Sequence, residues 1–182
     1  FIVEMLPQAE KTDVFEIESA GNKIVLRGTS GVAVASALNW YLKHYCSANL
    51  SWRGRQATLP DVLPPVSPKL RKETPFDWRY CFNYCCFSYS MAWWDWKDWE
   101  WAIDWMALNG INMPLAVTGQ ESVWLEVGRS FGLTDAELDE FFVGTAYLPF
   151  GWMGCMDGWG GPLSRQWVKQ HAALGKRILE RE

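Results

Sequence analysis

The sequence predicts an α/β fold, in which a small α+β domain is followed by the βα units of a parallel sheet. Three observations lead to this prediction: alternating apolar residues over 13–26, a proline-rich stretch over 60–75, and a strand–helix–strand order over 80–117. The first is typical of a hairpin, the second of an extended linker, and the third of a βαβ unit.

The N-terminal part begins with a predicted hairpin. Residues 14–18 alternate, Gly21-Asn22 provides the turn, and residues 24–26 resume the apolar pattern. Thr29 or Ser30 can cap a helix over residues 31–45, whose broad face contains Val34, Leu38, Tyr41, Leu42 and Tyr45. Small alanines in this helix would let it approach a sheet closely, and residues 50–52 are at most a short third strand.

Five prolines between residues 60 and 75 stiffen the next stretch as an extended linker. We therefore place an accessory α+β domain at residues 1–59, a linker at 60–76 and a second domain at 77–182.

The second domain opens with the stretch that organises the chain. Residues 80–90 are aromatic and Cys-rich without a helical period, which favours a buried strand. Asp95 can cap a helix that places Trp99, Ala102, Ile103 and Met106 on one face and charged residues on the other. Asn109-Gly110 ends that helix, and an apolar run over 111–117 follows. Pro114 fits such a strand poorly, because it lacks a donor for the ladder.

The remaining chain is predicted to be mainly helical. Helices are expected over 122–131, with Val123, Trp124, Val127 and Phe131 on one face, and from the capping box at Thr134 to Phe142. Residues 147–163 are too Gly-rich for regular structure and too aromatic for a solvated connector. Ser164 caps a last helix whose inward side chains are Trp167, Val168, Leu174, Ile178 and Leu179.

The order of these elements corresponds to the first two βα units of a (β/α)8 TIM barrel, which typically needs ~250 residues, so the barrel is expected to be incomplete. The carboxyl ends of barrel strands carry functional residues. Glu121, which follows the break at Gly119, is therefore a candidate acid or base, and an equally good interpretation places it in the first turn of the next helix, where it interacts with the helix dipole.

Composition restricts the possible functions. A net charge of −4 without runs of like charge gives no reason to expect nucleic acid or an anionic membrane as a partner. No stretch is apolar enough to span a membrane, and residues 1–4 lack the features of a signal peptide, so any targeting segment is expected to have been removed. The five cysteines favour free buried thiols over a disulfide framework, and no ligand spacing indicates zinc, so neither metal nor cofactor is expected.

Several motifs resemble the α-N-acetylglucosaminidases of glycoside hydrolase family 89. They are Asn83-Tyr84-Cys85, Ser88-Tyr89-Ser90, Trp93-Trp94-Asp95-Trp96, the ten positions from Ile103 to Asn112, and Gly119-Gln120-Glu121. The likeness continues through Glu140-Phe141-Phe142, Gly151, Met153-Gly154 and Trp159 to Gly161-Pro162-Leu163. It implies a retaining exo-glycosidase that removes terminal α-linked N-acetylglucosamine from glycans such as glycosaminoglycans or mucins, secreted, periplasmic or lysosomal in location.

Retention needs two carboxyl groups about 5 to 5.5 Å apart. The resemblance places this pair beyond Glu182, so no catalytic residue is assigned in this segment, which by itself is expected to be inactive without the rest of the catalytic domain. It implies a substrate-binding role for Asn83, Cys85 and the Phe150 position, with Glu121 in support. Relatives carry Trp where this chain has Phe150, and Phe lacks the indole donor.

Plainer interpretations remain open. Asn83 could be an amide that bonds to neighbouring backbone, Cys85 and Cys86 could be buried thiols on alternate faces of a strand, and most of the 13 Trp residues are expected in the core. The aromatic density is also compatible with a lectin-like carbohydrate-binding module without catalysis, or with a protein-interaction domain that exposes an aromatic patch.

Overall fold

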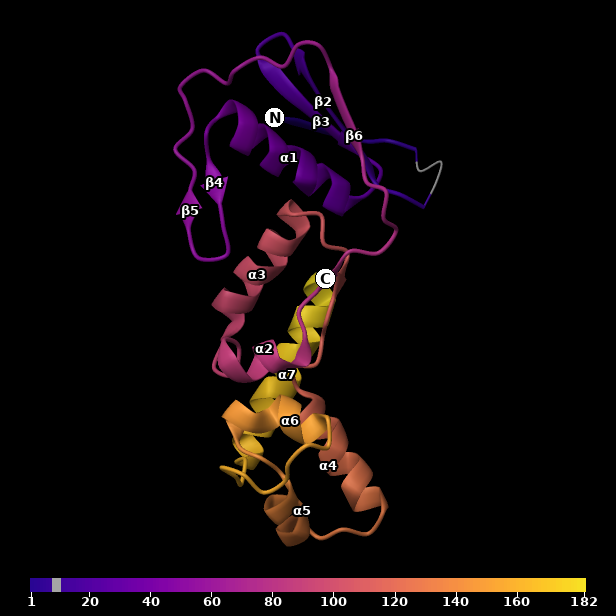
Figure 1. Cartoon of the computed structure of the whole chain (residues 1–182), viewed down its shortest axis with the longest axis vertical. Coiled ribbons are helices and arrows are strands. Elements are labelled where there is room, and N and C mark those ends of the chain that lie inside the picture. The colour runs from indigo at the N-terminus through magenta and orange to yellow at the C-terminus, as the bar shows by residue number, and fades with distance from the viewer. Residues whose placement is uncertain (8–10) are drawn as a thin grey trace. The chain divides into compact units, whose positions relative to one another are not determined.

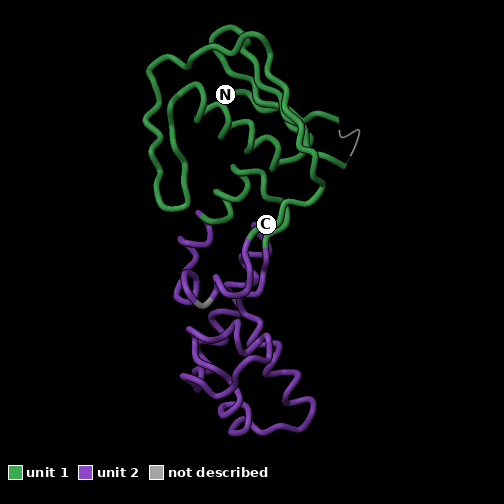
Figure 2. Tube along the Cα trace, viewed as in Figure 1, with its two compact units in different colours: residues 1–81, 102–114 green, residues 82–101, 115–182 purple. Residues whose placement is uncertain are grey.

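The computed structural model describes residues 1–7 and 11–182, apart from the side chain of Ser88. The chain divides into two compact units (Figure 2). Unit 1 contains residues 1–81 and 102–114, and unit 2 contains residues 82–101 and 115–182.

Unit 1 is built on a four-stranded sheet in the order β1-β3-β2-β6 (Figure 1). Its strands are β1 (Ile2–Met5), β2 (Val14–Ala20), β3 (Lys23–Gly28) and β6 (Leu70–Glu73). The predicted hairpin is confirmed, because β2 and β3 pair antiparallel through a turn in which Gly21 has a φ of 62°. Strand β1, which the sequence analysis missed, pairs parallel with β3.

Helix α1 (Gly31–Tyr45) packs against this sheet, as predicted. The Ser30 hydroxyl caps it by accepting a hydrogen bond of 3.0 Å from the backbone N–H of Ala33. Ala33 and Ala37 are buried at the contact, and Tyr41 is fully buried and donates its hydroxyl proton to the carbonyl of Pro64 at 2.8 Å. The small alanines therefore allow the close approach that the sequence indicated.

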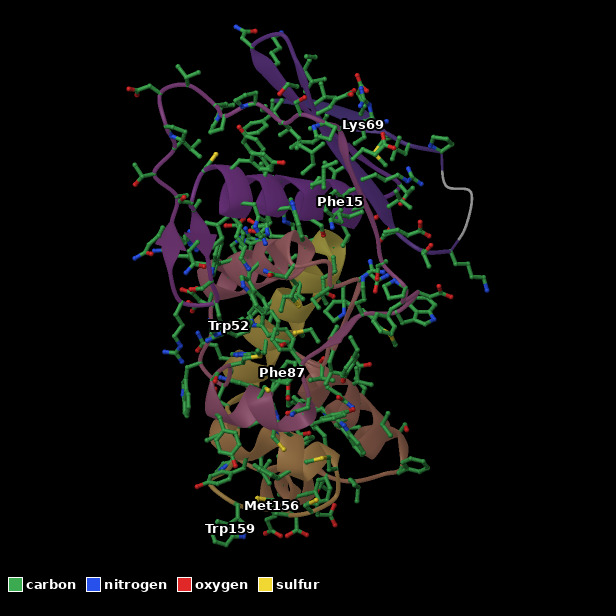
Figure 3. All side chains as sticks on the ribbon, turned by 45° about the horizontal axis from the view of Figure 1, so that its top comes forward. Phe15, Trp52, Lys69, Phe87, Met156 and Trp159 are labelled. Carbon is green, nitrogen blue, oxygen red and sulfur yellow. The ribbon has the colours of Figure 1, made fainter. Side chains whose placement is uncertain are left out.

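Strand β6 lies within the stretch that the sequence predicts as a linker. It pairs antiparallel with β2 and forms an edge of the sheet. Glu16 on β2 is buried and accepts hydrogen bonds from Lys69 (labelled in Figure 3) at 3.0 Å and from Arg71 at 2.9 Å. This ion pairing holds residues 69–73 on the sheet, although their composition alone carries no strand pattern. A short hairpin of β4 (Asn49–Leu50) and β5 (Arg55–Gln56) precedes them.

The predicted βαβ unit is present, but its strands are short. Strand β7 (Tyr80–Cys81) pairs parallel with β8 (Met113–Pro114). The Asn112 side chain accepts from the backbone N–H of Arg79 at 2.8 Å and donates to the carbonyl of Asp77 at 2.9 Å. Pro114 ends β8 in a two-stranded sheet, so a proline is accommodated without interrupting a longer ladder.

Helix α3 (Trp96–Leu108) connects these two strands. The Asp95 carboxylate accepts from the backbone N–H of Lys97 at 2.8 Å, as expected for a cap. The predicted face is confirmed, since Trp99, Ala102, Ile103 and Met106 are all buried.

Unit 2 is helical over most of its length. Its elements are α2 (Tyr84–Tyr89), α4 (Gln120–Ser130), α5 (Asp135–Phe141), the 3-10 helix η1 (Thr145–Tyr147), α6 (Leu148–Trp152) and α7 (Arg165–Arg181), with the start of α3. Its main apolar cluster joins α4, α5, α6 and α7 through Leu125, Leu138, Phe142, Val143, Leu148, Leu163 and Val168. The predicted capping box at Thr134 and the Ser164 cap are both present.

Helix α7 approaches the start of α4 so closely that two glycines are required. A Cβ on Gly175 would lie 2.1 Å from the carbonyl oxygen of Thr118, and one on Gly119 would lie 2.6 Å from the carbonyl oxygen of His171. Gly119 also has a φ of 87°, which side chains rarely adopt. These two glycines fix the first turn of α4 against α7.

The residues Val123, Trp124, Val127 and Phe131 share a face of α4, as predicted. That face is exposed, and Glu121, Leu125 and Gly128 are the buried positions. Two other predictions, on Leu179 and on the thiols, are wrong. Leu179 is exposed although Ile178 is buried. All five cysteines are free as expected, but four are half-buried and Cys155 is exposed.

The contact between β3 and α1 provides a test of this fold. A Cβ on Gly28 would lie 2.5 Å from the backbone nitrogen of Val34, whereas a Cβ on Gly31 would meet nothing within 4 Å. We expect Gly28→Ala to lower the free energy of unfolding by ~1 to 3 kcal/mol, because the helix must shift. Gly31→Ala is the matched control and should leave it unchanged or slightly raised.

Urea unfolding followed by circular dichroism measures both variants. Equal stability of Gly28→Ala and the parent chain would show that α1 does not lie this close to β3.

Candidate functional site

The turn after β7 brings Asn83 to the carboxyl end of a parallel strand. Between them, Phe82 has a φ of 75°, an unusual backbone conformation for a bulky residue. Its ring is held edge-on against those of Phe87 and Trp99, each with a centroid distance of 6.2 Å. Strained residues of this kind occur where surrounding packing over-determines the backbone, often at functional sites.

Asn83 begins a helix, which corrects the strand predicted over residues 80–90. Its side-chain oxygen accepts a hydrogen bond of 3.1 Å from the backbone N–H of Cys86, and it is therefore the N-cap of α2. Cys85 and Cys86 consequently lie in the first turn of a helix and not on alternate faces of a strand. Both are half-buried.

The capping bond fixes the orientation of the Asn83 amide. Its oxygen faces the helix, so its NH2 group points away from the cap, and the side chain is exposed. Two N–H donors are thus presented at the surface beside the half-buried Cys85.

Phe150 lies on α6, within the segment that the sequence predicts to lack regular structure. This helix packs against α2. The Phe150 ring is half-buried, with its centroid 6.4 Å from that of Tyr89 near the end of α2. The structure therefore places Asn83, Cys85 and Phe150 on two helices that contact each other.

A cluster of aromatic rings holds α2 in position. Phe87 (labelled in Figure 3) is buried on α2, and its centroid lies 5.8 Å from that of Trp99 and 6.5 Å from that of Trp152. Trp94 and Tyr84 extend the cluster, at 5.3 Å from Trp99 and 6.2 Å from Trp152 respectively. Phe87 and Trp99 are buried, whereas Tyr84, Trp94 and Trp152 are half-buried. The prediction that most Trp residues lie in the core is therefore wrong, because Trp99 is the one fully buried Trp among the described residues and Trp78, Trp93, Trp124 and Trp159 are exposed.

Glu121 lies in the first turn of α4 and is 1% exposed. Neither carboxylate oxygen has a hydrogen-bond partner of normal geometry. Burial raises the pKa of this carboxyl to about 7, against the smaller lowering effects of its own backbone N–H and of the Trp152 indole. The first-turn position that the sequence analysis left open is thus observed, but desolvation outweighs the local dipoles.

The Glu121 side chain lines a small cavity inside unit 2, of about 20 Å³. Its walls are Phe87, Met91, Ala92, Trp94, Trp99, Thr118, Gly119, Leu148, Trp152, Trp167 and His171. A volume of this size is just above what one water molecule occupies. A space of this size does not accommodate a pyranose ring.

His171 is the other titratable residue among those that line the cavity. Its ring stacks on that of Trp167 at 3.5 Å, and Nδ1 lies 3.1 Å from the Trp167 carbonyl oxygen. Burial lowers the pKa of His171, although the contact with that carbonyl opposes the change. At neutral pH this part of the site therefore combines a carboxyl group that is readily protonated with a neutral imidazole.

Sequence reasoning missed Trp152 and His171 as parts of the site. The only available signal was the aromatic density of residues 147–163, because the contacts of both side chains are set by tertiary packing. Within residues 1–7 and 11–182, no three His, Cys, Asp or Glu side chains form a group that could hold a metal ion. No helix in the same part of the chain is long and apolar enough to cross a membrane.

Comparison with known proteins identifies the family. The model of the α-N-acetylglucosaminidase TIM-barrel domain matches residues 79–182, and the model of the corresponding N-terminal domain matches residues 1–65. The chain belongs to the α-N-acetylglucosaminidase family. The resemblance predicted from the motifs around Asn83 and Ile103 is confirmed.

Relatives of known activity cover nearly all of this chain. Human α-N-acetylglucosaminidase is 44% identical over 169 residues, which are 92% of this chain and 23% of the human protein. A family 89 glycoside hydrolase from Clostridium perfringens, solved in complex with 2-acetamido-1,2-dideoxynojirimycin, is 38% identical and matches 99% of the chain with a TM-score of 0.94.

A variant of the Clostridium perfringens α-N-acetylglucosaminidase family member was also solved with its substrate GlcNAc-α-1,4-galactose, with the same identity and TM-score. The chain spans about a fifth of the length of these relatives.

The buried Glu121 carboxyl predicts a measurable pH dependence of stability. Its pKa is about 7 in the folded chain and near the ordinary value of 4.5 when unfolded. The folded state therefore retains a proton that the unfolded state loses, and stability should fall by roughly 3 kcal/mol as pH rises from 4.5 to 7. A smaller part should be lost between pH 7 and about pH 8, above which this contribution is constant.

Glu121→Gln should remove this slope, whereas Glu126→Gln, on the exposed side of the same helix, should retain it. His171 and Glu182, whose pKa values also change on folding, are present in all three proteins, so the difference in slope between the two variants reports the Glu121 carboxyl. Urea unfolding between pH 4.5 and 8 provides the measurement, and equal slopes for Glu121→Gln and the parent chain would mean that this carboxyl is not buried as described.

Proposed function

We propose that this chain is the N-terminal α+β domain and the first two βα units of the TIM barrel of a retaining exo-α-N-acetylglucosaminidase. The observation that carries the proposal is the match over 99% of the chain to a family 89 enzyme, with a TM-score of 0.94. The substrate would be a glycan with a terminal α-linked N-acetylglucosamine. The family resemblance supports an extracytoplasmic location, and the glycan could belong to glycosaminoglycans or mucins.

Asn83, Cys85 and Phe150 form the part of the sugar subsite that this chain would supply. The two outward amide N–H groups of Asn83 suit the hydroxyl oxygens of a pyranose, which accept hydrogen bonds. Phe150 offers an apolar ring face for the C–H groups of the sugar, without the indole donor that a Trp would supply. The half-buried Cys85 thiol, in the turn after Asn83, would contact the sugar edge between them.

The hydrolytic carboxylates are not assigned to this segment. Glu121 is enclosed and has no room beside it for a sugar, which argues against a direct acid or base role. The pair that retention requires would come from later strands of the barrel, so hydrolysis would need the remainder of the catalytic domain.

The alternative function is a lectin-like module that binds carbohydrate without catalysis. The exposed Trp93, Trp159 and Tyr89 rings would favour it, since exposed aromatic rings can stack on sugars. The two proposals differ in turnover: a protein that contains this chain and the rest of the barrel should release product from an aryl α-N-acetylglucosaminide, and a lectin should not.

Asn83 has a capping role and a proposed substrate role, and two substitutions separate them. In the enzyme with a complete catalytic domain, Asn83→Asp keeps the capping oxygen and removes both N–H donors. Asn83→Ala removes the capping oxygen as well as both donors. Both substitutions should lower kcat/KM, by an amount that corresponds to a loss of ~1.5 to 3 kcal/mol of transition-state stabilisation, because a sugar hydroxyl loses its donor. Only Asn83→Ala should also lower Tm.

Ser164→Ala is the matched control, because it removes the N-cap of α7 and should lower Tm without changing kcat/KM. Full efficiency in Asn83→Asp would show that Asn83 is a helix cap only and that the sugar subsite lies elsewhere.

A further inference from the structure

Three buried polar atoms in unit 2 share one cavity and have no partner. They are the two carboxylate oxygens of Glu121 and the indole nitrogen of Trp152, and no other such side-chain atom occurs among the described residues, from which the Ser88 side chain is excluded. Glu121 can accept hydrogen bonds and the Trp152 N–H can only donate. A donor and an acceptor that are both buried and unpaired would normally be costly, at about 1 to 3 kcal/mol each.

The size of the cavity that both residues line determines what can pair them. Both residues line the cavity of about 20 Å³, which suits one water molecule and nothing larger. Trp152 is close enough to lower the pKa of the Glu121 carboxyl, yet the two side chains do not form a direct hydrogen bond of normal geometry. Buried waters typically make about three hydrogen bonds to groups of this kind.

Trp152 is also the side chain that joins the helices of the proposed sugar subsite. Its ring contacts Tyr84 and Phe87 of α2, and it lies on α6 two residues after Phe150. A hydrogen-bonded link from α4 would therefore hold the Trp152 ring in its contacts with α2, and with it the spacing between Phe150 and Asn83.

We propose that Glu121 is a positioning residue, which holds α6 through one water molecule that bridges its carboxyl group to the Trp152 indole N–H. The inference rests on the proposed function, because the position of Phe150 matters only if it contacts sugar. Glu121 does not touch the substrate. The water accepts a hydrogen bond from the indole and donates one to a carboxyl oxygen, so the Trp152 N–H and one of the two Glu121 oxygens gain a partner.

The role predicts a specific kinetic pattern in the enzyme with a complete catalytic domain. Trp152→Phe keeps the ring and removes the donor, and Glu121→Met keeps the volume and removes the acceptors. Each should raise KM for an aryl α-N-acetylglucosaminide about tenfold with a smaller change in kcat, because a displaced Phe150 weakens contacts made in both ground and transition states. Glu121→Gln should keep KM within about twofold of the value of the parent enzyme, since an amide oxygen can accept a hydrogen bond from the same water.

Coupling separates this role from a simple loss of stability. The double variant Glu121→Met/Trp152→Phe should raise KM by the same factor as either single variant, because both substitutions remove the same water bridge. It should not raise KM by the product of the two single factors. Glu126→Gln, on the exposed side of α4, is the matched control and should leave KM unchanged. Independent, multiplicative effects on KM would overturn the proposal, as would variants that lower Tm with normal KM.

A crystal structure of the enzyme at high resolution gives a readout that does not depend on activity. It should show a water with its oxygen about 2.7 to 3.2 Å from a Glu121 oxygen and from Trp152 Nε1, and Trp152→Phe should lose it. The lack of such a water in the parent enzyme would overturn the inference even if turnover is normal. Lack of turnover by the parent enzyme, with the water in place, would instead count against the proposed function.

Discussion

The packing of Phe87, Trp99 and Trp152 is the constraint on which the rest of unit 2 depends. Phe87 belongs to α2, Trp99 to the start of α3 and Trp152 to α6, and their centroids lie within 6.5 Å of Phe87. These contacts bury large rings and hold the strained backbone of Phe82, so a helix of six residues can be stable where isolated helices of that length are not.

The same packing explains why one carboxyl group is buried nearby. The interlocked glycines Gly119 and Gly175 press the first turn of α4 against α7, and Glu121 is turned inward at that point. A charged carboxylate there is costly, so its pKa rises until it can be neutral near pH 7. Through the proposed water bridge, this carboxyl group would connect α4 to the helix that carries Phe150.

Local signals in the sequence were sufficient for elements with clear caps and long periods. The Ser30 and Ser164 caps, the capping box at Thr134 and the buried face around Trp99 follow from neighbouring residues only, and all are observed. Helix α2 could not be predicted in this way, since six residues rich in Tyr, Cys and Phe show β propensity and no period, and the Asn83 cap is recognisable only once the helix is known. Similarly, periodicity groups Val123 with Val127 but does not say whether that face is covered.

The candidate site was predictable in outline only. The motif around Asn83 and the family likeness pointed to the end of the first βα strand, but the roles of Trp152 and His171 depend on contacts between residues far apart in sequence. Glu121 illustrates the limit, because its position in the chain suggested catalysis and only its enclosure in a cavity of about 20 Å³ indicates a different role.

The central claim is that α2 and α6 together form a sugar subsite. A crystal structure of the enzyme with a complete catalytic domain, bound to an N-acetylglucosamine-like inhibitor, tests it most directly. The account predicts that an Asn83 N–H donates to a sugar hydroxyl at about 2.7 to 3.2 Å, and that the Phe150 ring and the Cys85 thiol contact the same sugar. A sugar bound in the barrel without contact to any of these three residues would contradict it.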